Sequence, residues 1–185
     1  MHFSYYILAA GRGRRAGGPK AWRLHAGIPL LAHHVDFLSQ RTSPEHIAVS
    51  IQAEWLERCL ALNPHIHWVA TDPQASPLAS LQRLALELPL VTWNFVYHVD
   101  MPLWTSQPFD VLAAACHSSD AEAIIPTFQD RGGHPVVLAK SLASPLAALD
   151  ASKDRLDHWL RSRRTNRVPL EEPAILENWN KPAES

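Results

Sequence analysis

The sequence predicts a three-layer αβα protein built on a doubly wound, mostly parallel sheet, and three observations support this prediction. Short apolar runs and amphipathic helical stretches alternate over the first hundred residues in the order β-loop-α-β-α-β-α-β. The apolar runs are apolar on both faces, as expected of parallel strands buried on both sides. Polar residues that can carry chemistry directly follow two of these runs, where the ligand site of such sheets lies.

The first hundred residues contain four predicted strands and three predicted helices. Pro29 suits the first turn of a helix, and Asn63-Pro64 is a typical stop for the second one. The third helix carries a leucine stripe at helical spacing. We expect strands over residues 3–10, 46–51, 65–70 and 93–99, and helices over 29–38, 53–62 and 77–88.

The remainder of the chain continues with shorter predicted elements. We expect helices over 108–116, 142–149 and 153–163, strands over 121–128 and 134–139, a turn over 129–133, and a short strand followed by a polar loop over 174–185. Ser152 is the expected N-cap of the helix at 153–163. Three arginines crowd its last turn, namely Arg161, Arg163 and Arg164. They either interact favourably with the C-terminal end of the helix dipole or form a phosphate-binding patch.

Composition and charge restrict the class of protein. A chain of 185 residues is expected to form one domain, residues 1–185, with a substantial core. Apolar residues make up 46% and charged residues 19%, which is a globular balance. The formal net charge of -1 argues against broad binding to nucleic acid. No apolar run has the length of a membrane span, and we expect neither a membrane partner nor a signal peptide.

The cysteines and histidines give no metal-binding pattern. Cys59 and Cys116 are isolated in helix-like stretches, outside any CxxC or Cys/His spacing. Neighbouring histidines are explained by alternation along a strand or adjacency on a helix, at His65-x-His67 and His33-His34. A reduced, cytoplasmic protein is the expectation that follows.

A basic, glycine-rich loop follows the first predicted strand. The segment from Gly11 to Lys20 contains four glycines, three arginines and a lysine. Glycine permits positive φ and has no Cβ to keep a phosphate away, so consecutive N–H groups can converge on its oxygens. Arg12, Arg14, Arg15 and Lys20 add positive charge, and arginine donates in a bidentate fork. The loop therefore predicts a site for nucleotide phosphates.

Two other phosphate loops match this segment less well. A Walker A loop needs Gly-Lys followed by Ser or Thr, whereas Pro19 precedes Lys20 and Ala21 follows it. A dinucleotide fingerprint begins with Gly11-x-Gly13, but its third glycine comes late and a proline follows. A basic surface turn without a ligand is the remaining structural alternative.

The loop resembles the signature of the MobA-like NTP transferases, the molybdenum-cofactor nucleotidyltransferases and related sugar-phosphate enzymes. The matching residues are Leu8-Ala-Ala-Gly11-x-Gly13-x-Arg15-x-Gly17-x-Pro19-Lys20, followed by Gly27-x-Pro29-Leu30-Leu31. Ala16 stands where the family usually has a large apolar residue. The resemblance implies a Rossmann-like nucleotidyltransferase fold of the GT-A type. It also implies Mg²⁺-dependent transfer of a nucleoside monophosphate from an NTP, GTP or CTP, to a phosphorylated acceptor of the molybdopterin type, with release of pyrophosphate.

Asp100 is the principal candidate for the magnesium ligand. It directly follows an apolar strand, where a buried carboxylate without a partner would be costly and a nearby cation is favoured. A turn or N-cap aspartate is the alternative. Asp100-Met101-Pro102 resembles the family segment whose aspartate binds the metal. The tail from Asn178 to Glu184 resembles the family's Asn-x-Asn-Thr-Pro-Glu segment, with Lys and Ala replacing Thr and Glu, which implies Asn180 as a second metal-site residue.

The remaining site residues are implied by the resemblance, segment by segment. Arg15 and Lys20 are expected to join Asp100 in catalysis. Gly132-Gly133-His134-Pro135 resembles an acceptor-side segment, which assigns Gly133 and His134 to the acceptor; His134 as a structural turn residue stays open. Ser76 to Leu81 resembles the segment that holds the base. The expected nucleotide-binding residues are Leu8, Ala9, Ala10, Gly11, Gly13, Arg15, Lys20 and Ser80.

Two further functions remain open at this point. A sugar- or alditol-phosphate nucleotidyltransferase would use the same chemistry on another acceptor, and the altered tail also fits a non-catalytic nucleotide-binding homologue. The Asn-x-Asn tail leans towards guanylyl transfer, while Gly-His-Pro leans towards the cytidylyl branch, so the base stays open. We expect a monomer or small homo-oligomer in which the basic loop and Asp100 face each other across a triphosphate.

Overall fold

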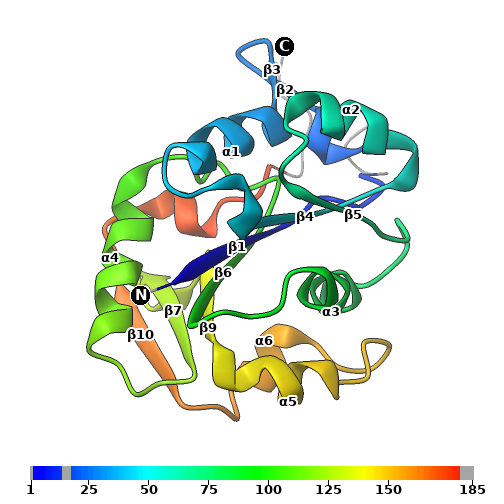
Figure 1. Cartoon of the computed structure of the whole chain (residues 1–185). Coiled ribbons are helices and arrows are strands. Elements are labelled where there is room, and N and C mark those ends of the chain that lie inside the picture. Colours follow the sequence, from blue (N-terminus) through cyan, green and yellow to red (C-terminus); the bar gives the residue numbers. More distant parts are fainter. Residues whose placement is uncertain (1, 14–17, 180–185) are drawn as a thin grey trace.

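A mostly parallel sheet forms the centre of the molecule. The computed structural model describes residues 2–13 and 18–179. Within them, an eight-stranded sheet has the order β10-β7-β9-β6-β1-β4-β5, and β8 pairs with β7 off this path (Figure 1). The strands are β1 (Phe3–Leu8), β4 (Ile47–Ile51), β5 (His67–Ala70), β6 (Trp93–His98), β7 (Ala123–Phe128), β8 (Arg131–Gly132), β9 (Val136–Ala139) and β10 (Thr165–Pro169).

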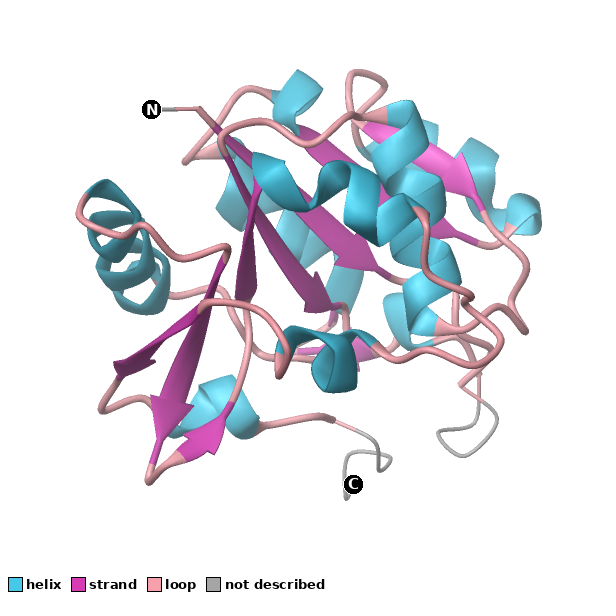
Figure 2. Cartoon of the chain, turned by 90° about the horizontal axis from the view of Figure 1, so that it is seen from below, coloured by secondary structure: helices cyan, strands magenta, loops and turns pink. Residues whose placement is uncertain are grey.

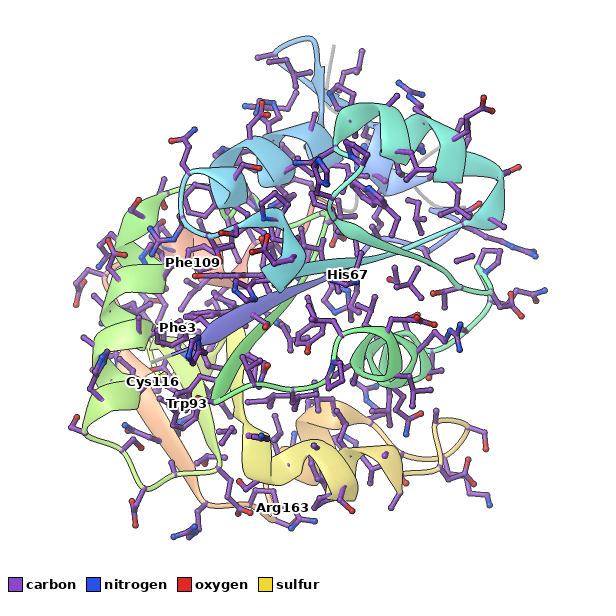
Figure 3. The ribbon with its side chains drawn as sticks, viewed as in Figure 1. Phe3, His67, Trp93, Phe109, Cys116 and Arg163 are labelled. Carbon is purple, nitrogen blue, oxygen red and sulfur yellow. The ribbon has the colours of Figure 1, made fainter. Side chains whose placement is uncertain are left out.

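Helices cover both faces of this sheet, which confirms the predicted three-layer fold (Figures 1 and 2). One core cluster lies between the sheet and three helices, and Figure 3 labels Phe109 and Cys116 on that side. These helices are α1 (Leu30–Ser39), α2 (Leu56–Leu62) and α4 (Ser106–His117). A second cluster lies on the opposite face, against α3 (Pro77–Glu87), α5 (Ala143–Ala147) and α6 (Leu156–Leu160).

The register of the central strands brings two chain segments together. β1 pairs in parallel with both β4 and β6, so that Leu8 lies beside Ser50 on one side and His98 on the other. All five residues of β4 are buried, as are five of the six in β6. Because parallel strands end at the same edge, the loops that follow β1, β4 and β6 share one end of the sheet.

β9 is the antiparallel member between β6 and β7. Val96 of β6 pairs with Val136 of β9, and Ile124 of β7 pairs with Val137. Because β9 runs in the opposite direction, its first residue lies near the last residues of β6 and β7. The segment that enters β9, Gly133 to Pro135, therefore reaches the same end of the sheet as the loops that leave the parallel strands.

The sequence expectation fails around residues 150–169. The predicted helix over 153–163 is only α6, and its N-cap position is Arg155, not Ser152. Ser152 instead donates from its hydroxyl and its N–H to the Asp150 carboxylate at 2.6 and 3.0 Å, which favours a turn. The chain then forms β10, an edge strand that pairs in parallel with β7 and that the sequence did not predict.

The three arginines after α6 do not share one role. The helix ends at Leu160, so the expected interaction with its last turn does not extend to the whole group. Arg163 instead stacks over the Trp159 ring at 4.7 Å, on the face that carries α5 and α6 (Figure 3). Arg164 forms an exposed ion pair with Asp120 at 3.5 Å. Arg161 is the C-cap residue of α6, and its N–H donates to the His158 and Trp159 carbonyls.

Several short elements also differ from the expectation. Residues Pro173–Leu176 form a 3-10 helix, η6, instead of a strand, because Pro173 has no N–H for a sheet and suits a first helical turn. The expected helix over 53–62 begins as a 3-10 turn, η4 (Ala53–Trp55), before α2. A small hairpin of β2 (Leu24–His25) and β3 (Ile28–Pro29) precedes α1. Across residues 2–13 and 18–179, none of the helices is long and apolar enough to cross a membrane.

Candidate functional site

The loops after β1 and β6 meet at the carboxyl end of the sheet. Val99 donates its N–H to the Leu8 carbonyl at 3.1 Å, which extends the pairing of these strands beyond their ends. Lys20, at the far end of the glycine-rich loop, places its Nζ 2.5 Å from the Asp100 Oδ2. The structure thus brings Lys20 and Asp100, eighty residues apart in sequence, into direct contact.

Asp100 is a buried carboxylate with a defined support. Its side chain is 7% exposed, and the side chain of Lys20 is 27% exposed. A carboxylate this deep needs a cation, and the ammonium group of Lys20 supplies one. Beneath it, His34 of α1 donates from Nε2 to the Val99 carbonyl at 3.0 Å. His34 is fully buried, and this burial lowers its pKa to about 4, so the ring is neutral at pH 7.

Gly13 and Gly18 close the glycine-rich loop. Gly13 has φ +58°, and its carbonyl accepts a hydrogen bond from the Gly18 N–H at 3.3 Å. A Cβ on Gly13 would lie 1.8 Å from the Gly18 oxygen, so only glycine fits there. By contrast, a Cβ on the exposed Gly11 would meet nothing within 4 Å. Arg15, an expected catalytic residue, lies outside the described residues.

The other expected nucleotide-binding residues differ in accessibility. Leu8, Ala9 and Ala10 are buried. The N–H of Ala9 already donates to the carbonyl and the hydroxyl of Ser50, both at 3.1 Å. Ser80 is a buried residue of α3, and its N–H donates to the Ser76 carbonyl at 3.0 Å. Exposed backbone for a ligand therefore begins at Gly11.

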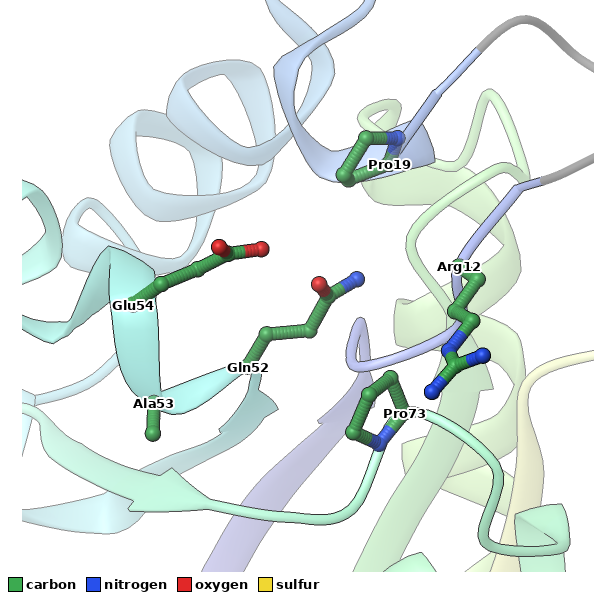
Figure 4. Close-up of a pocket in the computed structure, with 6 residues that line it drawn as sticks. All are labelled: Arg12, Pro19, Gln52, Ala53, Glu54 and Pro73. Carbon is green, nitrogen blue, oxygen red and sulfur yellow. The ribbon is translucent and has the colours of Figure 1, made fainter.

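A cavity of about 590 Å³ lies beside the glycine-rich loop (Figure 4). Its lining comes from the segments that follow β1, β4 and β5, namely Arg12, Pro19, Gln52, Ala53, Glu54 and Pro73. The side chain of Gln52 is anchored, because its Nε2 donates to the Gly11 carbonyl at 3.3 Å. Sequence reasoning missed Gln52 and Glu54, although their place directly after an apolar strand was an available signal. Ser80 is not among the six lining residues.

Two histidines, His98 and His134, lie near Asp100. The rings of His98 and His134 meet edge to face, with centroids 5.5 Å apart. Burial lowers the pKa of both, that of His134 to about 4, so both are neutral at pH 7. Sequence reasoning missed His98, which reads as an ordinary strand residue.

Gly133 has a packing reason to be glycine. It is buried, and a Cβ there would lie 2.5 Å from the Ile175 carbonyl oxygen. The same carbonyl accepts a hydrogen bond from the His134 N–H at 2.9 Å. The tail segment η6 therefore fixes the backbone that carries His134.

The end of the described chain is also fastened to the site. Trp179 donates its N–H to the Asp100 carbonyl at 2.8 Å, and its own carbonyl accepts from the Arg23 guanidinium. Its ring lies against His25 and Trp104, with centroids 4.8 and 5.7 Å apart. Asn180, the expected second metal-site residue, lies outside the described residues.

Asp100 is the buried carboxylate that contacts the end of the basic loop. Residues 2–13 and 18–179 contain no group of three His, Cys, Asp or Glu side chains that could hold a metal by themselves. Asp100 nevertheless fits Mg²⁺, which is commonly held by one or two carboxylates together with substrate phosphates and water. Its buried oxygen beside a basic loop is a donor that such a site would use.

Comparisons with known proteins give a consistent family. The MobA-like NTP transferase domain matches residues 5–168. A molybdenum cofactor guanylyltransferase from Cupriavidus metallidurans is 31% identical over 185 residues, covering 94% of this chain and 88% of that protein. Among solved structures, Rv0371c from Mycobacterium tuberculosis has a TM-score of 0.79 at 16% identity, covering 98% of this chain and 93% of that one. Molybdopterin-guanine dinucleotide biosynthesis protein A from Archaeoglobus fulgidus has a TM-score of 0.72 at 18% identity, with 97% and 93% covered.

Proposed function

This chain belongs to the MobA-like NTP transferase family and is a nucleotidyltransferase, and from this premise we propose its reaction. It transfers the nucleoside monophosphate of GTP or CTP to a phosphorylated acceptor of the molybdopterin type, in a Mg²⁺-dependent step. The similarity to a molybdenum cofactor guanylyltransferase supports the acceptor class. The observation that carries the proposal is the contact of Lys20 with the buried Asp100 at the joined ends of β1 and β6.

The reaction joins two anions, so charge neutralisation and alignment are the main tasks of the site. An oxygen of the acceptor phosphate attacks the α-phosphorus and forms the new P–O bond. The bond from the α-phosphorus to its bridging oxygen breaks, and pyrophosphate leaves with the electron pair. The acceptor phosphate is itself the nucleophile, so the protein needs no nucleophilic side chain.

The basic loop is the part of the site that holds the triphosphate in this proposal. The backbone from Gly11 to Gly13 lies against its oxygens, and Arg15 and Lys20 supply positive charge. Leu8, Ala9 and Ala10 form the buried foot of the loop. Ser80 supports the segment near the nucleobase. Lys20 contacts Asp100 and would donate to a phosphate oxygen when the triphosphate is bound.

Asp100, with Asn180 as the second residue, would hold Mg²⁺ against the reacting phosphates. When bound, the ion neutralises phosphate charge and polarises the α-phosphate. Gly133 and His134 form the acceptor side, because the segment entering β9 lies beside His98, two residues before Asp100. The Nδ1 of His134 faces the Val96 carbonyl at 3.5 Å, and a neutral ring has one N–H, so His134 donates to an acceptor phosphate only if that N–H is on Nε2 instead.

The first test replaces Asp100. Asp100→Asn keeps the shape of the side chain but removes its charge, and we expect Mg²⁺-dependent pyrophosphate release to fall at least about hundredfold. Asp110→Asn is the matched control, because Asp110 is an exposed aspartate of α4 paired with Arg41, and its activity should stay near that of the unmodified chain. An Asp100→Asn rate within about threefold of the original would refute the metal assignment.

A panel of acceptors separates the proposed substrate from the alternatives. Each of the four NTPs is offered with molybdopterin, sugar phosphates and alditol phosphates, and released pyrophosphate is measured. Turnover with molybdopterin and with no other acceptor supports the proposal. Turnover with a sugar or alditol phosphate instead would identify that compound as the acceptor and contradict the proposal. Nucleotide binding without release for every acceptor would identify a non-catalytic homologue.

A further inference from the structure

The cavity beside the glycine-rich loop is lined by two side chains with hydrogen-bond acceptors, Gln52 and Glu54, and by one cation, Arg12. Its six lining residues belong to the segments that follow three adjacent parallel strands, which is the expected position of a ligand in this fold. Its volume of about 590 Å³ suits a nucleobase with its sugar. The inference below rests on the proposed function, in that it takes this cavity as the place of the base.

Gln52 presents an acceptor to the cavity. Its side chain comes from the end of β4, the residue is 6% exposed, and its Nε2 is engaged by the Gly11 carbonyl. This hydrogen bond fixes the orientation of the amide. The Oε1 atom accepts no hydrogen bond from the described residues, and Figure 4 shows the amide pointing into the space between Glu54 and Arg12.

Glu54 presents a second acceptor on the same side. It lies on η4, two residues after Gln52, and its carboxylate points towards the Gln52 amide (Figure 4). Glu54 forms no ion pair with the described residues, so its oxygens are available to a ligand. Arg12 lines the opposite side and is the cation among the six lining residues.

We propose that Glu54 is the residue that selects the base, and that it selects guanine. Guanine carries two adjacent donors, N1–H and the 2-amino group, which a carboxylate accepts together, and its O6 and N7 atoms accept from arginine. A neighbouring amide oxygen, Gln52 Oε1, gives the 2-amino group a further acceptor. This arrangement of two acceptors opposite one guanidinium matches the polar edge of guanine.

The other bases match this lining less well. On its pairing edge, cytosine places an acceptor, N3, beside its 4-amino donor, and adenine places N1 beside its 6-amino donor. Uracil has a single N3–H between two carbonyl oxygens. Each of these edges sets at least one acceptor against the Glu54 carboxylate, which costs a hydrogen bond and adds repulsion.

The test measures nucleotide binding without any acceptor substrate, by calorimetry with GTP, ITP, CTP and ATP in the presence of Mg²⁺. We expect GTP to bind at least about tenfold more tightly than CTP or ATP, and ITP, which lacks the 2-amino group, to bind about tenfold more weakly than GTP. In Glu54→Gln the preference for GTP over ITP and CTP should fall to within about threefold. Glu57→Gln, an exposed acid of α2 outside the cavity lining, should keep it.

The outcomes separate this inference from the proposed function. Equal binding of the four nucleotides, or a GTP preference that survives in Glu54→Gln, overturns the role of Glu54 and leaves nucleotide transfer standing. If none of the nucleotides binds, both are overturned. A melting temperature of Glu54→Gln within about 1 °C of the original, expected for an exposed residue, shows that any change in binding is local.

Discussion

Gly11 and Gly13 are two residues apart in one loop, yet a methyl group would meet opposite surroundings at each. On Gly13 it would collide with the Gly18 carbonyl, and the positive φ there disfavours any other residue. On Gly11 it would enter open space, in a backbone without positive φ. Gly13 is therefore required by the loop itself, whereas Gly11 leaves room for a ligand that approaches it.

This difference predicts two distinct phenotypes. Gly13→Ala should distort the loop and lower the melting temperature. Gly11→Ala should leave the melting temperature within about 1 °C while it weakens NTP binding at least about tenfold, because the methyl group occupies the approach of the phosphates. Thermal unfolding and calorimetric titration with GTP measure the two effects. A Gly11→Ala variant that binds GTP normally would show that the phosphates do not pass over this residue.

At the residue scale, the sequence identified some groups of the site and not others. Asp100 and Lys20 were both marked by motifs, and the topology explains their contact. Gln52 was passed over, although it follows a strand as directly as Asp100 does, because no glycine, charge or motif drew attention to it. Its role depends on a hydrogen bond to Gly11, which only the packing of β4 against β1 creates.

At the element scale, the segment after η6 holds the loop that carries Asp100 in place. Trp179 holds this loop through the Asp100 carbonyl and through ring contact with Trp104. The aromatic contact contributes about 1 kcal/mol beyond the burial of its area. These contacts hold the backbone of Asp100, the proposed magnesium ligand.

Trp179→Ala should therefore affect both stability and metal dependence. We expect its melting temperature to fall by about 2–4 °C and the Mg²⁺ concentration for half-maximal activity to rise several-fold. Trp159→Ala is the control, because Trp159 is also partly buried but packs on the opposite face of the sheet. It should lower the melting temperature without changing the Mg²⁺ requirement. If both variants needed the same Mg²⁺ concentration for half-maximal activity, the tail would have no role in the metal site.

The elements that the sequence missed share a physical cause. The strands of the central sheet were predictable because burial on both faces requires continuous apolar runs. The edge strand β10 carries polar residues and a proline, Thr165-Asn-Arg-Val-Pro169. It pairs with β7 at the edge of the sheet without an apolar run, so the sequence pattern did not reveal it. Around Asp150, side-chain hydrogen bonds to the local backbone form a turn in place of the first part of the predicted helix, which therefore begins only at Leu156.

At the scale of the whole molecule, the buried histidines make folding depend on pH. The folded pKa of His34 is about 4, below its ordinary value of 6.5, because burial disfavours the charged ring. Between these values the unfolded chain binds a proton that the folded chain does not, so the free energy of unfolding decreases as the pH falls from about 6.5 to 4. At pH 7 and above the ring is neutral in both states, and this loss is absent. For His34 it reaches about 3 kcal/mol at the lower end.

Urea denaturation between pH 7 and pH 5 measures this slope. His34→Gln removes one of the titrating groups and should make the slope shallower, with His98 and His134 giving the remainder, even if it lowers stability at every pH. His117→Gln serves as the comparison, because His117 is exposed, and it should retain the full slope. Parallel curves for the original chain and His34→Gln would assign the acid sensitivity to other groups.

The reversed direction of β9 has an evolutionary consequence. In a purely parallel sheet, only turns that leave a strand can contribute to a shared ligand site, and each is tied to the helix that follows it. Here the turn that enters β9 also contributes to the site, and it connects the antiparallel strands β7 and β9 without a helix between them. Such a hairpin can lengthen, shorten or change its residues while the crossovers around β1 and β4 stay as they are. Descendants of one ancestor could thus exchange acceptors freely and still keep the same nucleotide.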